Sequence, residues 1–233
     1  MATLYLIPTT LGEGDLDSVL PSNNVNIIKQ LSYFIVENIR SARRFLKKVD
    51  RSIDIDSLHF SELNRHTNMA TITSFVEPLK KGFDVGIVSE AGCPAIADPG
   101  ADIVGLAQNM GVKVVPLVGP SSILLSLMAS GFNGQSFAFE GYLPIDKQAR
   151  VQRIKQLERR ISSEHQTQIF IETPYRNNQL LQDLISTLNP KTKICVASQL
   201  TTAEEMIKTM SVVEWKKNKI DIHKKPTIFL IYQ

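Results

Sequence analysis

The stretch Val85–Gly100, VGIVSEAGCPAIADPG, decides the fold class of this chain. It opens with a short apolar run that has no polar alternation, which is typical of a strand buried on both faces of a parallel sheet. A loop of small residues follows, and a helix is then predicted over Ala101–Met110 that closes at Gly111. Open α/β sheets bind ligands at such strand–loop–helix junctions. The stretch therefore predicts a ligand-binding edge or, as the alternative, an ordinary turn rich in glycine and proline.

The composition predicts a soluble, cytoplasmic protein with a sizeable core. Apolar residues make up 43% of the 233 and charged residues 21%, and the net charge of +3 permits nucleic acid as a partner without requiring it. No apolar stretch is long enough to cross a bilayer, and the first residues lack the pattern of a signal peptide. Cys93 and Cys195 fit neither a zinc site nor a disulfide framework, which favours a reducing compartment. His59 and His66 lack the further ligands of a metal site, so no metal is expected.

The N-terminal half reads as strands alternating with helices. Strands are predicted at Leu4–Ile7, Tyr33–Val36, Leu58–Phe60 and, as another buried strand, Lys113–Val118; helices are predicted at Val25–Leu31, from Arg40 onward, at Asn68–Lys80 and at Ile123–Ser130. The helix after Arg40 is strongly basic. It presents a solvated face or, alternatively, contacts a nucleic-acid backbone through Arg43, Arg44 and Lys47.

The C-terminal half also alternates, but with longer and more charged helices. Strands are predicted at Phe137–Pro144, Thr167–Ile171, Lys193–Ala197 and Thr227–Tyr232, helices at Asp146–Ile161 and Asn177–Leu188, and a helical or irregular segment at Glu204–Lys219. We expect an α/β protein with two domains, residues 1–118 with a mostly parallel sheet and residues 119–233 with a mixed sheet. The loops at the strand ends would line a cleft between them.

Four stretches together resemble one family. They are VSEAGCPAIADPG, PLVGPSSILLSLMASG, FAFEGYLP and FIETPYR, in this order along the chain. In this combination the chain resembles the tetrapyrrole methylase superfamily, whose members use S-adenosylmethionine. Within it the chain is most similar to the branch that methylates the ribose 2′-hydroxyl of a cytidine in small-subunit ribosomal RNA. The likeness covers nearly the whole chain, from Leu4 to the last strand.

The resemblance implies a two-domain, tetrapyrrole-methylase-like fold, a homodimer, and S-adenosylmethionine bound between the domains, with S-adenosylhomocysteine as product and no metal. Carried over position by position, the cofactor-binding residues are Pro8, Leu11, Ser89, Glu90, Ala91, Gly92, Cys93, Ile96, Ser121, Ser122, Glu172, Thr173, Lys225, Pro226 and Thr227. Ser121 and Ser122 have an ordinary alternative role, because hydroxyls at a helix start cap backbone N–H groups.

The sequence departs from the branch on the expected substrate side. The usual Ala-Glu-Asp-Thr-Arg segment is Val36-Glu37-Asn38-Ile39-Arg40 here, Ser-Asp-Ala-Gly has become Ser89-Glu90-Ala91-Gly92, and the first loop lacks the usual Asn. Glu37, Arg40 and Glu90 are the candidate catalytic residues: a carboxylate could take the proton of a ribose hydroxyl, and Arg40 could orient a phosphate. Glu37 and Arg40 are also spaced to pair with each other.

Three functions are compatible with these residues. The leading hypothesis is a methyltransferase acting on RNA of the ribosomal subunit, with no membrane involved. The second is a methylase of a small molecule such as a tetrapyrrole, which the modest charge and the altered substrate loops leave open. The third is a catalytically idle module that binds the cofactor or RNA, for which the changes at Glu13, Asn38 and Ile39 argue.

Overall fold

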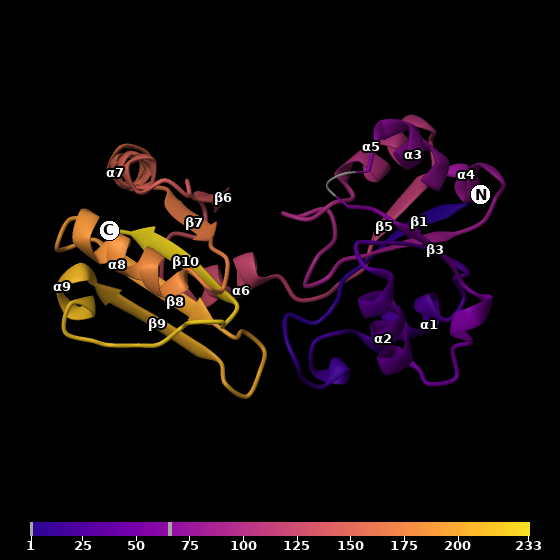
Figure 1. Ribbon diagram of the computed structural model, residues 1–233, viewed down its shortest axis with the longest axis horizontal. Helices are drawn as coiled ribbons and strands as arrows, with labels where there is room; N and C mark the ends of the chain where they lie inside the picture. Colours follow the sequence, from indigo (N-terminus) through magenta and orange to yellow (C-terminus); the bar gives the residue numbers. More distant parts are fainter. Residues whose placement is uncertain (1, 65–66) are drawn as a thin grey trace. The chain divides into compact units, whose positions relative to one another are not determined.

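Figure 1 shows the computed structural model of the protein, which describes residues 2–64 and 67–233. The chain divides into two compact units, Met1–Ser121 and Ser122–Gln233. Each unit is built on one five-stranded sheet with helices packed against it. The α/β fold expected from the sequence, with one parallel and one mixed sheet, is confirmed.

The sheet of the first unit is parallel throughout. Its elements are β1 (Thr3–Ile7), α1 (Ser22–Ile28), β2 (Tyr33–Val36), α2 (Ile39–Val49), β3 (His59–Glu62), α3 (Met69–Phe75), α4 (Glu77–Lys80), β4 (Val85–Val88), α5 (Ala101–Asn109) and β5 (Lys113–Pro116), with short 3-10 turns at Leu16–Ser18 and Ile55–Ser57. The strands lie in the order β3-β2-β4-β1-β5 and pair in parallel. All five carboxyl ends therefore lie at one edge of this sheet.

Strand β4 is the centre of the first unit, and all four of its residues are buried. Helices α1 and α2 pack on one face of the sheet, whereas α3, α4 and α5 cover the other (Figure 1). Gly86 lies in the middle of β4. A Cβ atom at this position would lie 2.6 Å from Ile7 Cδ1 and 3.0 Å from Leu31 Cδ1. The missing side chain thus lets the layer of α1 close directly onto the central strand.

The second unit carries the mixed sheet. Its elements are α6 (Ser122–Ser130), β6 (Phe137–Tyr142), α7 (Lys147–Glu164), β7 (Thr167–Ile171), α8 (Asn177–Thr187), β8 (Lys193–Ser198), β9 (Met206–Ser211), α9 (Val212–Trp215) and β10 (Thr227–Tyr232). The strand order is β6-β7-β10-β8-β9; β6 and β7 are parallel, and the other pairs are antiparallel.

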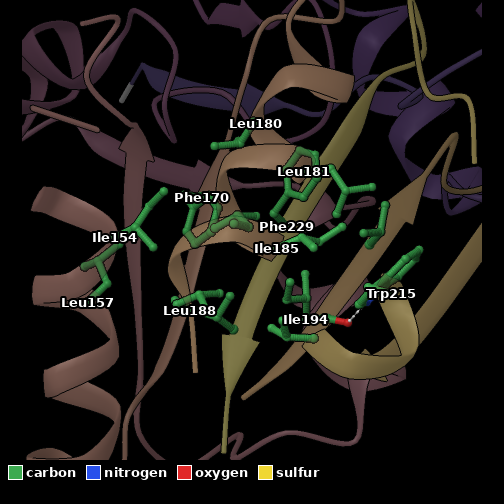
Figure 2. Close-up of a cluster of buried hydrophobic side chains, with 14 of the residues drawn as sticks. Ile154, Leu157, Phe170, Leu180, Leu181, Ile185, Leu188, Ile194, Trp215 and Phe229 are labelled. Atoms are coloured by element: carbon green, nitrogen blue, oxygen red, sulfur yellow. Dashed lines mark hydrogen bonds between the residues drawn. The ribbon is translucent and has the colours of Figure 1, made fainter. Parts of the chain in front are cut away.

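The core of the second unit lies between this sheet and helices α7 and α8 (Figure 2). Phe170 of β7 and Phe229 of β10 stack with ring centroids 6.2 Å apart. Trp215, which is 1% exposed, donates its indole N–H to the carbonyl of Ile194 at 2.9 Å. The largest apolar side chain of this core therefore also satisfies its one polar atom.

Three expectations about individual elements were wrong. Strand β5 is not buried, because it lies at the edge of its sheet and its end residues are exposed. The single helix expected over Asn68–Lys80 is divided into α3 and α4, because Pro78 has no N–H to continue the ladder and begins a new helix instead. The segment Glu204–Lys219, expected to be helical or irregular, does contain the short helix α9 but also strand β9, whose hydrogen bonds come from its partner β8.

Replacing Gly86 by alanine is expected to destabilise the protein by about 1–3 kcal/mol, because the new methyl group overlaps Ile7 and Leu31. Gly105→Ala is the matched control. Gly105 lies inside α5 with open space around it, so alanine there should stabilise by up to about 1 kcal/mol. Urea unfolding of the two variants measures both effects. An equal loss of stability in both would contradict the central role of Gly86.

Candidate functional site

The loops after β1 and β4 are hydrogen-bonded to each other at the carboxyl edge of the first sheet. The N–H of Thr9 donates to the carbonyl of Gly92 at 2.9 Å, and the Thr9 hydroxyl donates to the carbonyl of Ser89 at 3.3 Å. The Ser89 hydroxyl, which is buried, donates to the carbonyl of Gly92 at 2.6 Å. The two loops therefore hold each other in place, and the hydroxyls of Thr9 and Ser89 already donate hydrogen bonds to backbone carbonyls.

The loop after β5 approaches these two loops through glycine. A Cβ atom on Gly119 would lie 2.3 Å from Pro8 Cγ, and one on Gly92 would lie 3.1 Å from Leu11 Cδ2 and 3.3 Å from the carbonyl oxygen of Pro120. Gly92 also has a φ of +75°, which disfavours other residues. The loops at the edge of the first sheet are consequently packed closely against one another, with the two glycine backbones in contact with the side chains of Pro8 and Leu11.

The expected cofactor residues of the first unit gather at this edge with different exposures. Pro8, Ser89 and Gly92 are buried, Leu11, Cys93 and Ser121 are half-buried, and Glu90, Ala91 and Ile96 are exposed. Ala95 and Ala97, in the same loop, have φ angles of 64° and 61°. Non-glycine residues with positive φ are uncommon, and strained backbone of this kind concentrates at functional sites.

The candidate catalytic residues come from two loops of the same edge. Glu37 directly follows β2 and is half-buried, and it lines a cavity of about 10 Å³ together with Ser89 and Asp98. This volume corresponds to roughly one water molecule. Arg40 lies in the first turn of α2, whose start is capped by the Asn38 side chain accepting from the N–H of Ser41 at 3.1 Å. Glu90 points to solvent from the loop after β4.

Strand pairing brings the corresponding loops of the second unit to one edge of its sheet. Ile171 at the end of β7 and Ser198 at the end of β8 are opposite Ile228 and Thr227 at the start of β10. The loops 172–176, 199–205 and 222–226 therefore meet there. Glu172, Thr173, Lys225, Pro226 and Thr227 all lie at this edge, and Ser122 is the first residue of α6.

Glu172 is a structural anchor of the loop after β7. Its side chain is 2% exposed, and its carboxylate accepts from Arg176 Nη2 and from the N–H of Thr173, both at 2.6 Å. The buried negative charge is thus compensated within its own loop. A ligand would meet the backbone of this loop more readily than the carboxylate.

Asn177 connects this loop to the segment before β10, and sequence reasoning did not identify it. The side chain is fully buried; its Nδ2 donates to the carbonyls of Ile222 at 3.3 Å and Lys225 at 2.7 Å. Its Oδ1 is buried without a hydrogen-bond partner among the described residues. The N–H of Lys224 donates to the carbonyl of Pro174 at 2.9 Å. The only signal in the sequence was a polar residue directly behind the FIETPYR stretch.

The segment before β10 is also fixed from the side of β8. The N–H of Gln199 donates to the carbonyl of Pro226 at 2.8 Å, and the Thr227 hydroxyl lies within hydrogen-bonding distance of Ser198 Oγ at 3.0 Å. Gln199, Thr201 and Lys224 have φ angles of 54°, 66° and 60°. Strained, hydrogen-bonded main chain therefore marks this edge as it marks the edge of the first sheet.

Other kinds of site find little support. Burial raises the pKa of the Cys93 thiol, so the thiol stays neutral and is a poor nucleophile. Within residues 2–64 and 67–233, no group of three or more His, Cys, Asp or Glu side chains is arranged to hold a metal ion. His66, half of the histidine pair considered in the sequence, lies outside the described residues. In the same part of the chain, no helix has both the length and the apolar character needed for a membrane crossing.

Comparison with known proteins identifies relatives along nearly the whole chain. Residues 6–214 match the family model of the tetrapyrrole (corrin/porphyrin) methylases. The ribosomal RNA small subunit methyltransferase I of Vibrio cholerae is 32% identical over 212 residues, which are 91% of this chain and 69% of the relative. The protein of the same name from Buchnera aphidicola subsp. Schizaphis graminum is 29% identical over 231 residues, which are 98% of this chain and 77% of the relative.

Solved structures share the fold at much lower identity. The methyltransferase CobJ matches 100% of this chain and 93% of its own with a TM-score of 0.64 at 16% identity. The cobalt precorrin-4 methyltransferase CbiF matches 99% and 94% with a TM-score of 0.61 at 14% identity. The resemblance carried by the four sequence stretches is thereby confirmed, and the chain belongs to the tetrapyrrole (corrin/porphyrin) methylase family and is a methyltransferase.

Proposed function

We propose that the protein transfers a methyl group from S-adenosylmethionine to ribosomal RNA of the small subunit, at a ribose 2′-hydroxyl. The observation that carries this proposal is the similarity to proteins named ribosomal RNA small subunit methyltransferase I, which extends along 91–98% of the chain. The geometry is compatible with it, because at one edge of each sheet the loops that carry expected cofactor residues are hydrogen-bonded to one another.

The residues fit S-adenosylmethionine. Gly92 and Gly119 have no side chain, so Leu11 packs against Gly92 and the Pro8 ring against Gly119, and the loops after β1, β4 and β5 lie close together at the edge where the expected cofactor residues are. In the second unit, Asn177 Oδ1 is a buried polar atom that accepts no hydrogen bond from the residues that the structure describes, and it is still able to accept one. We infer that residues of both units hold the cofactor: Pro8, Leu11, Ser89–Cys93, Ile96 and Ser121 from the first, and Ser122, Glu172, Thr173 and Lys225–Thr227 from the second.

S-adenosylmethionine supplies an electrophilic methyl group on a sulfonium. The protein must hold an attacking oxygen about 3 Å from that carbon and exclude water. Glu37 is the best-placed candidate for taking the proton of the hydroxyl, because it is half-buried at the edge beside Ser89. Glu90 is more exposed and is the weaker candidate. Arg40 would contact an RNA phosphate.

A small-molecule acceptor remains a second candidate, since the family model itself is named for tetrapyrrole methylases. The solved methyltransferase structures share the fold at 14–16% identity, which says nothing about the acceptor. The relatives at 29–32% identity are the ribosomal RNA enzymes, and they favour RNA. An RNA substrate also suggests the cytoplasm, where the free thiols of Cys93 and Cys195 would stay reduced.

Calorimetry with S-adenosylhomocysteine should show binding, and labelled S-adenosylmethionine should methylate small ribosomal subunits from cells that lack this protein. Subunits from cells that contain it serve as the control and should accept little label, because the target is already modified. Binding without transfer to any RNA fraction would contradict the enzyme and favour the idle module. Transfer to a tetrapyrrole alone would establish the second candidate.

Gly119→Ala should weaken S-adenosylhomocysteine binding at least tenfold. The added methyl group overlaps the Pro8 ring and must displace the loop after β1 or β5. Gly134→Ala is the matched control, because Gly134 also lies in a loop but has open space around its Cα. Calorimetry on both variants provides the measurement. Unchanged affinity in Gly119→Ala would remove this edge from the cofactor site.

We further propose that the protein is a homodimer. Large apolar side chains are exposed on the second unit: Leu124 is 52% and Met128 79% exposed one turn apart on α6, and Ile145 is 73% exposed. Exposed apolar groups of this size favour association. Sedimentation equilibrium should give about twice the 26.0 kDa of one chain, and Met128→Lys should shift the equilibrium toward monomer. A monomer at micromolar concentration would contradict the proposal.

A further inference from the structure

We propose that Arg40 and Arg44 of α2 form the contact surface for the phosphate backbone of the RNA substrate, whereas the other cations of this helix serve its own fold. This inference rests on the RNA substrate proposed above and specifies which side chains meet it. The sequence alone offered Arg43, Arg44 and Lys47 as phosphate contacts without distinguishing among them, whereas the structure shows which cations of the helix already have partners within the protein.

Three of the basic side chains on α2 are engaged within the protein. Lys47 Nζ donates to the carbonyls of Arg51 at 3.0 Å and Ile53 at 2.7 Å, and so holds the turn that follows the helix. Lys48 Nζ donates to the carbonyl of Gly14 at 2.5 Å. The Arg43 guanidinium lies 5.6 Å from the centre of the Phe60 ring and 3.9 Å from an Asp56 carboxylate oxygen.

Arg40 and Arg44 are different. Both are exposed, and within the described part of the chain neither side chain has a hydrogen-bond or ion-pair partner. They are four residues apart, so they lie one above the other on the same face of the helix. Ala42 and Leu46, the buried residues of α2, point to the opposite side. The two guanidinium groups therefore project together into solvent.

The positions of Arg40 and Arg44 lower the stability of the protein when no RNA is bound. Arg40 lies in the first turn of α2, where the helix dipole disfavours a cation, and that turn contains no acidic residue. Arg40 and Arg44, like Arg44 and Lys48, are like charges spaced four apart, an arrangement that destabilises a helix. A polyanion lying along this face would reverse both effects. The first turn of α2 also begins at the carboxyl edge of the sheet, directly after Glu37, so RNA bound there would be next to the proposed site.

The test is an equilibrium salt titration with a fluorescently labelled RNA hairpin from the small ribosomal subunit. Each phosphate contact contributes about 0.7–0.9 to the slope of log affinity against log salt. The double variant Arg40→Gln/Arg44→Gln should therefore lose about 1.4–1.8 in slope and roughly tenfold or more in affinity at low salt. Its melting temperature should be unchanged or higher, because the repulsion along α2 is relieved.

The matched control is Lys81→Gln/Lys113→Gln. It removes the same charge from exposed side chains at the amino end of the same sheet, just before β4 and at the start of β5. It should keep the slope of the wild type. An unchanged slope in the arginine variant, or the same loss in both variants, would overturn the proposal, the latter because net charge alone would then explain binding.

A third arm uses vesicles of phosphatidylglycerol and phosphatidylcholine. Binding to these vesicles that equals RNA binding and is lost in the arginine variant would assign the surface to anionic lipid and overturn the proposal. Methyl transfer by the wild type is measured in parallel. If the wild type binds RNA through Arg40 and Arg44 but transfers no methyl group, the proposed function fails while the phosphate surface stands.

Discussion

The first unit depends on how closely other residues approach its central strand. Because Gly86 has no side chain, Ile7, Leu31 and Phe34 pack directly over β4. All four residues of the strand are buried as a result. Because β4 pairs with β1 on one side and β2 on the other, its position sets the register of both neighbours. The loops that leave β1, β2 and β4 therefore start from fixed points, and the hydrogen bonds among Thr9, Ser89 and Gly92 can form.

The two units fix their edges by different means. In the first, the absence of a side chain at glycine lets neighbouring side chains pack directly against the main chain. In the second, buried side chains serve as connectors: Glu172 binds Arg176, and Asn177 bridges two carbonyls. Arg150 likewise fixes the loop after β6. It is paired with Asp183 at 2.7 Å and donates to the carbonyls of Pro144 and Ile145 at 3.0 and 2.6 Å. Buried groups that are hydrogen-bonded in this way hold a loop in one conformation, which pre-organises it for a ligand.

The basic side chains differ in whether a partner within the protein explains their position. Cations with partners, such as Arg150 and Arg176, are buried or half-buried and fix loops at the edge of the second sheet. Lys47 and Lys48 perform this role at the surface of the first unit by binding carbonyls. Arg40 and Arg44 remain as cations whose position the fold itself does not explain, and that contrast makes them informative about the substrate.

The sequence by itself determined most of the elements and the family. Buried strands such as β4, β7 and β10 are short apolar runs bounded by turn residues, so they can be predicted from the neighbouring sequence alone. The four motifs lie at strand ends, where backbone geometry demands particular small residues. They therefore carry the resemblance that the comparisons confirmed.

Only the tertiary structure decided the features that depend on distant partners. Strand β9 exists because β8 supplies its hydrogen bonds, and β5 is exposed because nothing pairs with its outer side. Asn177 gains its role from carbonyls 45 and 48 residues away. Lys47 lies on the same helix as Arg40 and Arg44, but it donates to the carbonyls of the turn that follows the helix. A local pattern records how a residue suits a helix or strand, but it does not record which distant group will satisfy a side chain or leave it free.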